Sequence, residues 1–216
     1  MSRGRFITLE GGEGAGKSTQ EAMLAQSVTD RGYRVVRKRE PGGTPAGEAI
    51  RHVVLSPESD GLDARAEALL FAAARGEHVA RVIRPALERG DVVIQDRYLD
   101  SSVAYQGAGR VLDAGEIRAL SLWAAEGALP DLTVLLDLDP ARARARLDAD
   151  DKPFDRLEAE REDFHSRVRD AFWTLAADEP ERFLVVDASQ PPASISAALQ
   201  ARVIPLLSAG SDDVEG

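Results

Sequence analysis

One stretch of the chain, Gly11 to Ser18, has residue types and spacing that could hold phosphate groups. It fits the pattern G-x-x-x-x-G-K-[ST], and an apolar run, Arg5 to Glu10, leads directly into it. Its glycines would let backbone N–H groups point at phosphate oxygens, and a helix beginning at Lys17 would add its positive dipole end. Lys17 would then reach the β and γ phosphates, and the Ser18 hydroxyl would bind Mg²⁺. We interpret the stretch as a nucleotide phosphate site rather than a flexible turn.

Strand-like and helix-like segments alternate along the rest of the chain. Strands are expected at 6–10, 34–39, 92–96, 132–138 and 183–187. Helices are expected at 17–31, 64–89, 114–126, from 139–140 onward, 158–177 and 194–207. This alternation predicts an α/β fold, with a five-stranded parallel sheet and helices on both faces. We expect a single domain over 1–208 and a frayed polar tail over 209–216.

The composition excludes several classes of protein. The chain has 216 residues, no cysteine and a net charge of −10, so disulfides, thiolate metal sites and a broad nucleic-acid-binding face are not expected. It has no apolar run long enough to span a membrane and no secretory leader, which predicts a cytoplasmic protein. Small phosphorylated ligands remain compatible with this charge.

Polar residues follow four of the predicted strands, at the edge where a parallel sheet of this kind binds ligands. They are Glu10 with the phosphate loop, Arg39 to Thr44, Asp96 to Tyr98, and Asp137 to Pro140. We therefore expect the candidate site at the carboxyl ends of the strands.

Taken together, these segments resemble the thymidylate kinase family over nearly the whole chain. The segments that carry the resemblance are Glu10–Ser18, Arg39–Thr44, Phe71–Arg75, Asp96–Tyr98, Ser101–Gly107 and Pro130–Thr133. The resemblance implies a P-loop NTPase fold with a small mobile lid, phosphorylation of dTMP to dTDP with ATP and Mg²⁺, and a homodimer. The residues it implies for ATP binding are Gly11, Gly12, Glu13, Gly14, Ala15, Gly16, Lys17, Ser18 and Thr19.

The resemblance also implies how the acceptor nucleoside would be held. Phe71 would stack on thymine, and Arg75 would donate to O4, where cytosine instead presents an amino group. Tyr105 would crowd the 2′ position and favour deoxyribose, with Ser102 and Gln106 lining the same pocket. Without the resemblance, Phe71 could equally be a core aromatic residue.

Charged residues would complete the acceptor site. Arg97 and Arg39 would clamp the acceptor phosphate, and Glu13 would meet a sugar hydroxyl, although it could also be a solvent-facing loop charge. Glu10 would orient a Mg²⁺-bound water or the acceptor, or act only as a cap. The resemblance thus makes Lys17, Arg97 and Glu10 candidate catalytic residues.

The metal would be held by Ser18 and Asp96. Asp137 or Asp139 is an alternative, because a strand also ends there. We prefer Asp96, since the neighbouring Arg97 completes a phosphate site; a simple salt bridge is the competing interpretation for Asp96.

The lid is expected at 147–156, and its catalytic arginine is the least certain assignment. Some family members carry an arginine within the phosphate loop, whereas Ala15 places this chain among those that supply it from the lid. Aspartates replace several expected basic residues there, which leaves Arg146 and Arg156 as candidates, and we favour Arg156. The arginines just before the lid could simply solvate a helix.

Two other functions remain open on this sequence. The chain could be a kinase for another nucleoside monophosphate, such as dUMP or UMP, or an ATPase switch that binds partners. A switch protein would not need Arg39, Arg75 and Arg97 to converge on an acceptor. The sequence therefore favours a nucleotide kinase with small-molecule partners.

Overall fold

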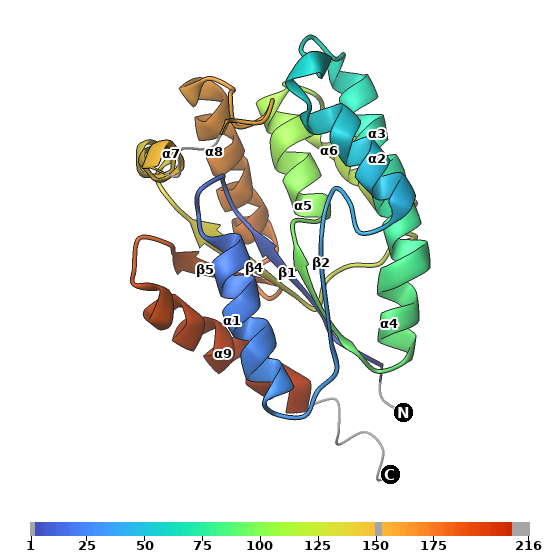
Figure 1. Cartoon of the computed structure of the whole chain (residues 1–216), viewed down its shortest axis with the longest axis vertical. Helices are drawn as coiled ribbons and strands as arrows, with labels where there is room; N and C mark the ends of the chain where they lie inside the picture. The colour runs from blue at the N-terminus through green and yellow to red at the C-terminus, as the bar shows by residue number, and fades with distance from the viewer. Residues whose placement is uncertain (1–2, 150–152, 209–216) are drawn as a thin grey trace.

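The computed structural model of the chain describes residues 3–149 and 153–208. Five strands form one parallel sheet: β1 (Phe6–Glu10), β2 (Val35–Arg39), β3 (Val92–Asp96), β4 (Leu132–Asp137) and β5 (Phe183–Asp187). Their order is β2-β3-β1-β4-β5, so the first strand lies at the centre (Figure 1). The expected strands are confirmed to within one residue, and the expected tail lies outside the described residues.

The register of the central strands positions the site. Leu9 of β1 lies opposite Asp96 of β3 and Val134 of β4, so these three strands reach the same edge of the sheet together. The loop after Glu10 and the segment after Asp96 therefore leave the sheet side by side, as expected for parallel strands.

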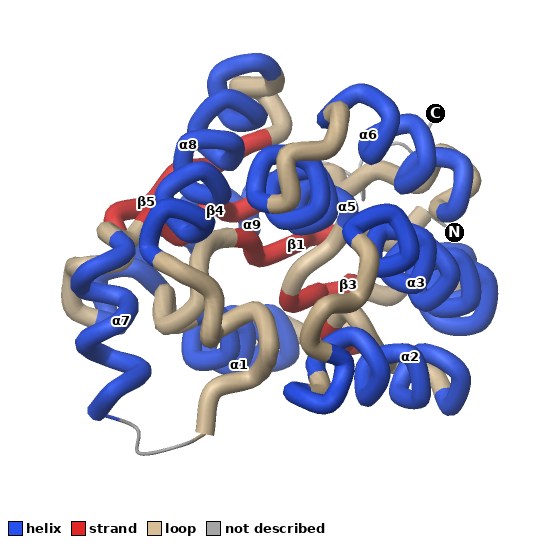
Figure 2. The backbone as a smooth tube through the Cα atoms, turned by 90° about the horizontal axis from the view of Figure 1, so that it is seen from above, coloured by secondary structure: helices blue, strands red, loops and turns tan. Residues whose placement is uncertain are grey.

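Helices cover both faces of the sheet (Figures 1 and 2). They are α1 (Lys17–Thr29), α2 (Pro45–Leu55), α3 (Ala64–His78), α4 (Arg84–Glu88), α5 (Leu99–Ser102), α6 (Ala114–Ala124), α7 (Pro140–Ala149), α8 (Glu162–Asp178) and α9 (Pro192–Ser208). Ile7 and Leu9 pack toward α1 and α9, whereas Phe6 packs with residues of α4 and α5 on the opposite face. None of the helices in the described ranges is both long and apolar enough to cross a bilayer.

The helix expected at 64–89 is interrupted rather than uniform. A π-helical segment, η2 (Val79–Ile83), joins α3 to α4, and Pro85 lies in the first turn of α4. Proline has no N–H to donate and its ring clashes with the preceding turn, so a locally wider turn lets the chain continue. A second π-helical segment, η3 (Val103–Gly109), extends α5 and carries two candidate site residues, Tyr105 and Gln106.

Two other helix boundaries differ from the sequence expectation. Helix α2 was not expected, yet Thr44 caps it, its hydroxyl accepting a hydrogen bond from the Gly47 N–H at 3.0 Å. Helix α8 begins at Glu162 instead of residue 158, because Asp155 and Glu158 bond to each other's backbone in a separate turn. The start of α2 is thus set by a side-chain cap, whereas α8 starts after this turn, and its N-cap residue Arg161 provides no side-chain cap.

Candidate active site

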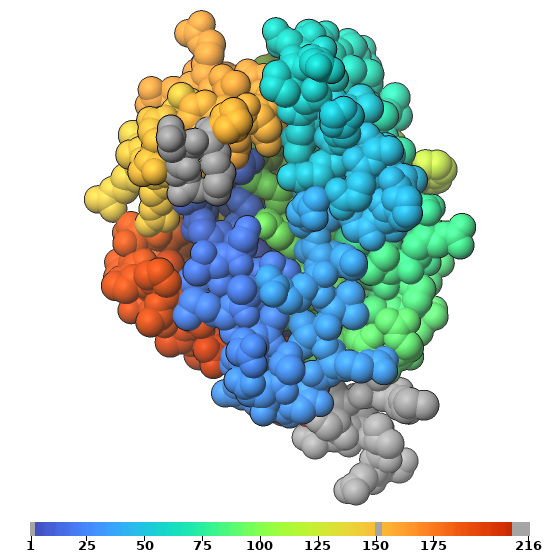
Figure 3. Space-filling model, in the orientation of Figure 1, coloured from blue at the N-terminus to red at the C-terminus, as the bar shows by residue number. Residues whose placement is uncertain are grey.

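A cavity of about 830 Å³ opens at the carboxyl edge of the sheet. It lies between the phosphate loop, α2 and the C-terminal end of α7, and Figure 3 shows the hollow on this face. Every residue expected to bind the acceptor lines it: Glu13, Arg39, Phe71, Arg75, Arg97, Ser102, Tyr105 and Gln106. The phosphate loop lines the same cavity from Glu13 to Thr19, so both halves of the expected site share one space.

The phosphate loop connects β1 to α1 and can be built only with glycine at key positions. Gly11 has φ +134°, and a Cβ there would lie 2.4 Å from the Leu136 carbonyl oxygen. Gly14 has φ +68°, and its Cβ would lie 2.8 Å from the carbonyl oxygen of Ala143. Positive φ values and the close approach of neighbouring backbone exclude other residues at both positions. The loop thus packs directly against Leu136 of β4 and Ala143 of α7.

Lys17 is folded back over this loop. Its Nζ donates to the carbonyl oxygens of Gly11 at 3.2 Å and Gly12 at 2.8 Å, and the side chain is buried. Burial lowers the pKa of Lys17, and the nearby Arg97 lowers it further. The ammonium group is thus held at the loop, where the negative charge of a bound phosphate would favour its charged form.

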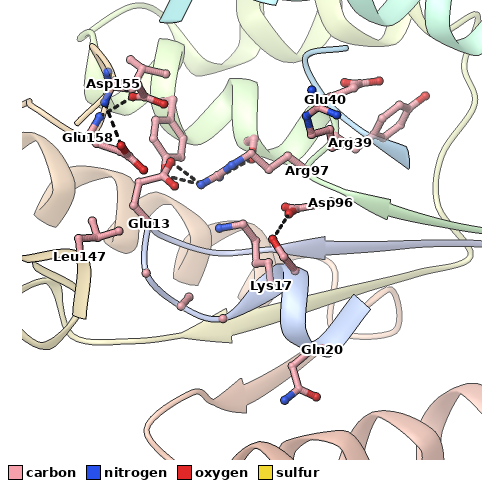
Figure 4. Close-up of a pocket in the computed structure, with 18 of the residues that line it drawn as sticks. Glu13, Lys17, Gln20, Arg39, Glu40, Asp96, Arg97, Leu147, Asp155 and Glu158 are labelled. Atoms are coloured by element: carbon pink, nitrogen blue, oxygen red, sulfur yellow. Dashed lines mark hydrogen bonds and ion pairs between the residues drawn. The ribbon is translucent and has the colours of Figure 1, made fainter. Parts of the chain in front are cut away.

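Arg97 extends into the cavity and is held there by four hydrogen bonds (Figure 4). Its guanidinium donates to Glu13 at 2.5 Å, the Gly11 carbonyl at 3.0 Å, Ser101 at 3.1 Å and Tyr105 at 3.2 Å. Although burial opposes ionisation, Arg97 and Lys17 lower the pKa of Glu13 to about 2. The backbone of Arg97 is left-handed, with φ 65°, which turns the side chain from β3 into the cavity.

Ser18 and Asp96 meet beside the phosphate loop. The Ser18 hydroxyl donates to Asp96 Oδ2 at 3.3 Å, and Asp96 Oδ1 is buried without a hydrogen-bond partner among the described residues. Asp137, the alternative, is instead held by Arg169 at 2.7 and 2.8 Å. Asp139 caps the start of α7. The oxygen pair of Ser18 and Asp96 fits the few protein ligands that Mg²⁺ takes beside nucleotide phosphates.

Glu10 lies beneath the cavity rather than in its lining. It is fully buried and accepts hydrogen bonds from the Tyr98 N–H at 2.8 Å and from the Ser101 N–H and hydroxyl at 3.3 and 2.5 Å. Burial and the neighbouring Asp100 raise its pKa to about 7. Its contacts hold the segment that follows Arg97 in place, so in this conformation Glu10 is a positioning residue.

Arg75 is buried at the end of the cavity that Phe71 also lines. Its guanidinium bonds to Glu40 at 2.9 Å, Ser121 and Ser102 at 3.0 Å, and the Tyr98 carbonyl at 3.2 Å. Guanidinium has five N–H donors, so one N–H of Nη1 has no protein partner among the described residues. The side chain is thus fixed in orientation and still able to donate.

The two lid candidates lie in different places. Arg146 of α7 lines the cavity and donates to the carbonyl oxygens of Gly14 at 3.2 Å and Ala188 at 2.9 Å. Arg156 does not line the cavity; it is buried, bonded to the Val54 carbonyl at 2.9 Å and to Glu67. In this conformation the Arg156 guanidinium is used in buried contacts outside the cavity, so its catalytic role stays a prediction.

Several cavity residues were not anticipated from the sequence. Arg51 of α2 lines the cavity and donates to the Pro41 carbonyl at 3.1 Å, and burial together with Arg39 lowers its pKa. Recognising from the sequence that a helix starts after Thr44 could have placed Arg51 in the site. Other unanticipated lining residues are Asp155 and Glu158 on the lid side and Ala188, Gln190, Pro192 and Ile195 after β5. Burial raises the pKa of both Asp155 and Glu158.

Comparisons with known proteins agree with this architecture. The family model described as thymidylate kinase matches residues 9–199. The chain is 64% identical over 208 residues to the thymidylate kinase of Clavibacter michiganensis subsp. michiganensis, covering 96% of this chain and 98% of the relative. It is 65% identical over 200 residues to that of Leifsonia xyli subsp. xyli, covering 93% and 94% of the two chains.

A solved structure supports the same grouping. The crystal structure of thymidylate kinase from Ehrlichia chaffeensis superposes with a TM-score of 0.71 at 35% identity, covering 85% of this chain and 93% of the other. The residues that match the family model, 9–199, include every residue that lines the cavity. The chain therefore belongs to the thymidylate kinase family.

Proposed function

We propose that this enzyme transfers the γ-phosphoryl group of ATP to the 5′-phosphate of dTMP, giving dTDP and ADP. The observation that carries the proposal is the shared cavity, because the phosphate loop and all eight residues expected for the acceptor line the same space. Two anionic nucleotides could thus meet end to end within about 830 Å³. A cavity that served ATP hydrolysis alone would not need the buried, oriented Arg75 beside Phe71.

The chemistry requires alignment and neutralisation of charge rather than a strong base. The attacking atom is a phosphate oxygen of dTMP that is already anionic, and the leaving group is ADP. Lys17 would contact the phosphate that is transferred, while Arg97, Arg39 and Arg51 would hold the acceptor phosphate. These cations would offset the repulsion between the two nucleotides and the charge of the transition state.

Mg²⁺ fits the position of Ser18 and Asp96. The unpartnered buried Oδ1 of Asp96 and the adjacent Ser18 hydroxyl could hold the ion directly or through water. When bound, Mg²⁺ would neutralise charge on the phosphates of ATP. No described group of three or more His, Asp or Glu side chains could hold a metal alone, which favours an ion that arrives with the nucleotide.

We propose Arg146 as the arginine supplied by the lid side. It already contacts the phosphate-loop carbonyl of Gly14 and lines the cavity. Donor binding would provide phosphate oxygens close to this guanidinium, which could exchange its carbonyl partners for them. Arg156 would then be a structural residue that anchors the end of the expected lid segment on Val54 and Glu67.

The proposed assembly is a homodimer formed through α3 and α6. These helices pack side by side, and their outer faces leave Leu69 and Trp123 58% and 80% exposed. Large exposed apolar side chains of this kind favour association with a matching surface, and a second copy supplies one. The cytoplasmic location expected from the sequence stays a prediction.

The test of the proposed activity is turnover with a panel of nucleoside monophosphates, followed through ADP release. We expect dTMP to be the best acceptor, dUMP to be weaker because it lacks the 5-methyl contact, and dCMP to be poor. Equal turnover with all of them would contradict base recognition by Phe71 and Arg75. ADP release that is indifferent to dTMP would instead favour the ATPase switch.

A further inference from the structure

The amide of Gln106 has a fixed direction in the cavity wall. Gln106 lies on η3, lines the cavity, and donates from Nε2 to Glu67 Oε1 at 2.8 Å. Its Oε1 has no hydrogen-bond partner among the residues that the structure describes. An amide carries its donor and its acceptor on opposite sides, so whatever fixes one side also determines what the other presents.

Glu67 is held as an anion at this place. It is completely buried on α3, and Arg110 donates to its two oxygens at 3.2 and 3.1 Å. Arg156, whose Nε is anchored on the Val54 carbonyl, donates to the second oxygen as well. A carboxylate between two guanidinium groups can only accept hydrogen bonds, so Gln106 must turn its NH₂ group toward Glu67.

We propose that Glu67 is a positioning residue that sets the base selectivity of the acceptor site through the amide of Gln106. The proposal rests on the proposed function. With its NH₂ on Glu67, Gln106 presents a carbonyl oxygen to the base. Thymine and uracil carry a donor at N3, whereas N3 of cytosine is an acceptor. Glu67 therefore favours bases with an N3–H, although it does not contact the base itself.

This selection is separate from the reading of O4 by Arg75. Arg75 is oriented by a different buried carboxylate, Glu40, at 2.9 Å. Arg75 offers a donor and Gln106 an acceptor, which matches O4 and N3–H of thymine. Cytosine presents the reverse polarity at both positions. Each base-reading side chain thus has its own buried anion, so the two contributions can be tested independently.

The decisive variant is Glu67→Gln, which removes the charge and allows the Gln106 amide to reverse. We expect kcat/KM for dTMP relative to dCMP to fall by roughly three- to tenfold, the worth of one hydrogen bond. The ratio of dTMP to dUMP should not change, because both bases carry N3–H. An unchanged ratio of dTMP to dCMP in this variant would overturn the proposal.

Glu160→Gln provides the matched control. Glu160 pairs with Arg110 in the same ion cluster but has no contact with Gln106 among those that the structure describes. If the ion cluster had a purely structural role, both variants would lose similar stability and would keep the ratio of dTMP to dCMP. We expect Glu160→Gln to keep the selectivity of the original enzyme. An equal loss of selectivity in this variant would contradict the assignment to Glu67.

A double-mutant cycle locates the effect at the amide. In a Gln106→Met background, Glu67→Gln should cause no further change in the ratio of dTMP to dCMP. A second fall of the same size would show that Glu67 acts by another route. Failure of the original enzyme to phosphorylate dTMP would refute the proposed function itself, and is therefore distinguishable from failure of this inference.

The unmodified enzyme offers a test that does not depend on the folding of a variant. With ¹⁵N-labelled glutamine, the side-chain resonances of Gln106 can be assigned by their loss in Gln106→Met. We expect one Nε2 proton to be protected from solvent exchange, both with and without bound dTMP. Fast exchange of both protons would mean that the amide is not held by Glu67, and would overturn the proposal.

Discussion

At the scale of single residues, Lys17 tests whether the phosphate loop supplies charge to the reaction. Replacing Lys17 by Ala should lower kcat by about 10²- to 10³-fold, the usual cost of losing one group that stabilises the transition state. The fold should survive, because the loop is shaped by glycines and β4 rather than by this side chain. A coupled ADP assay and circular dichroism would measure both. Lys38→Ala on β2 is the control, and near-normal turnover of Lys17→Ala would contradict the proposed donor site.

Glu10 gives a prediction about pH. Its pKa is about 7 in the folded protein against an ordinary value of 4.5, because burial and Asp100 disfavour the anion. Between these values the folded state binds more protons than the unfolded state, so this group's contribution to stability falls as pH rises from about 4.5 to 7. Gln cannot ionise, so Tm of Glu10→Gln minus Tm of the original enzyme should increase across this range. A difference independent of pH would contradict the raised pKa.

The phosphate loop could be predicted from the sequence, whereas the environment of Arg156 could not. The phosphate loop was predictable because its pattern is local and its glycines have backbone reasons to be there. The environment of Arg156 was not, because it depends on Glu67, 89 residues earlier in the chain. A charged residue in a lid-like segment was assigned to chemistry, whereas the fold uses it in a buried ion cluster.

At the scale of elements, α7 carries the proposed lid-side arginine. Arg146→Ala should lower kcat by at least about tenfold, since it removes a charge beside the phosphate loop, and should leave KM for dTMP nearly unchanged. Arg142→Ala on the same helix is the matched control. Arg156→Ala should lower Tm while changing kcat little. The assignment fails if Arg146→Ala turns over normally while Arg156→Ala does not.

The elements themselves were predicted unevenly, for physical reasons. Four of the five strands are short, mainly apolar runs, so their limits were clear from the sequence, whereas β2 combines two valines with three basic residues. Helix α2 was missed although Thr44 and Pro45 form a helix start, because the glycines before it suggested only a loop. The π-helical segments were missed because nothing in a periodic pattern marks an extra residue in a helical turn.

At the scale of the whole molecule, the exposed face of α3 and α6 predicts association. The original enzyme should elute as a dimer with light-scattering detection, and Trp123→Glu should shift it toward the monomer because a charge would be buried at the contact. Arg81→Glu is a charge-change control on the exposed surface of η2. A monomeric original enzyme would contradict the proposed assembly without affecting the active-site assignment.

The central claim is that donor and acceptor occupy one cavity end to end. Calorimetry with a bisubstrate analogue, adenosine and thymidine joined through their 5′-phosphates, tests it most directly. We expect one analogue to bind per chain and to abolish the binding heat of both dTMP and ATP. If dTMP still bound with unchanged affinity to the saturated protein, the acceptor would lie elsewhere and the account would be wrong.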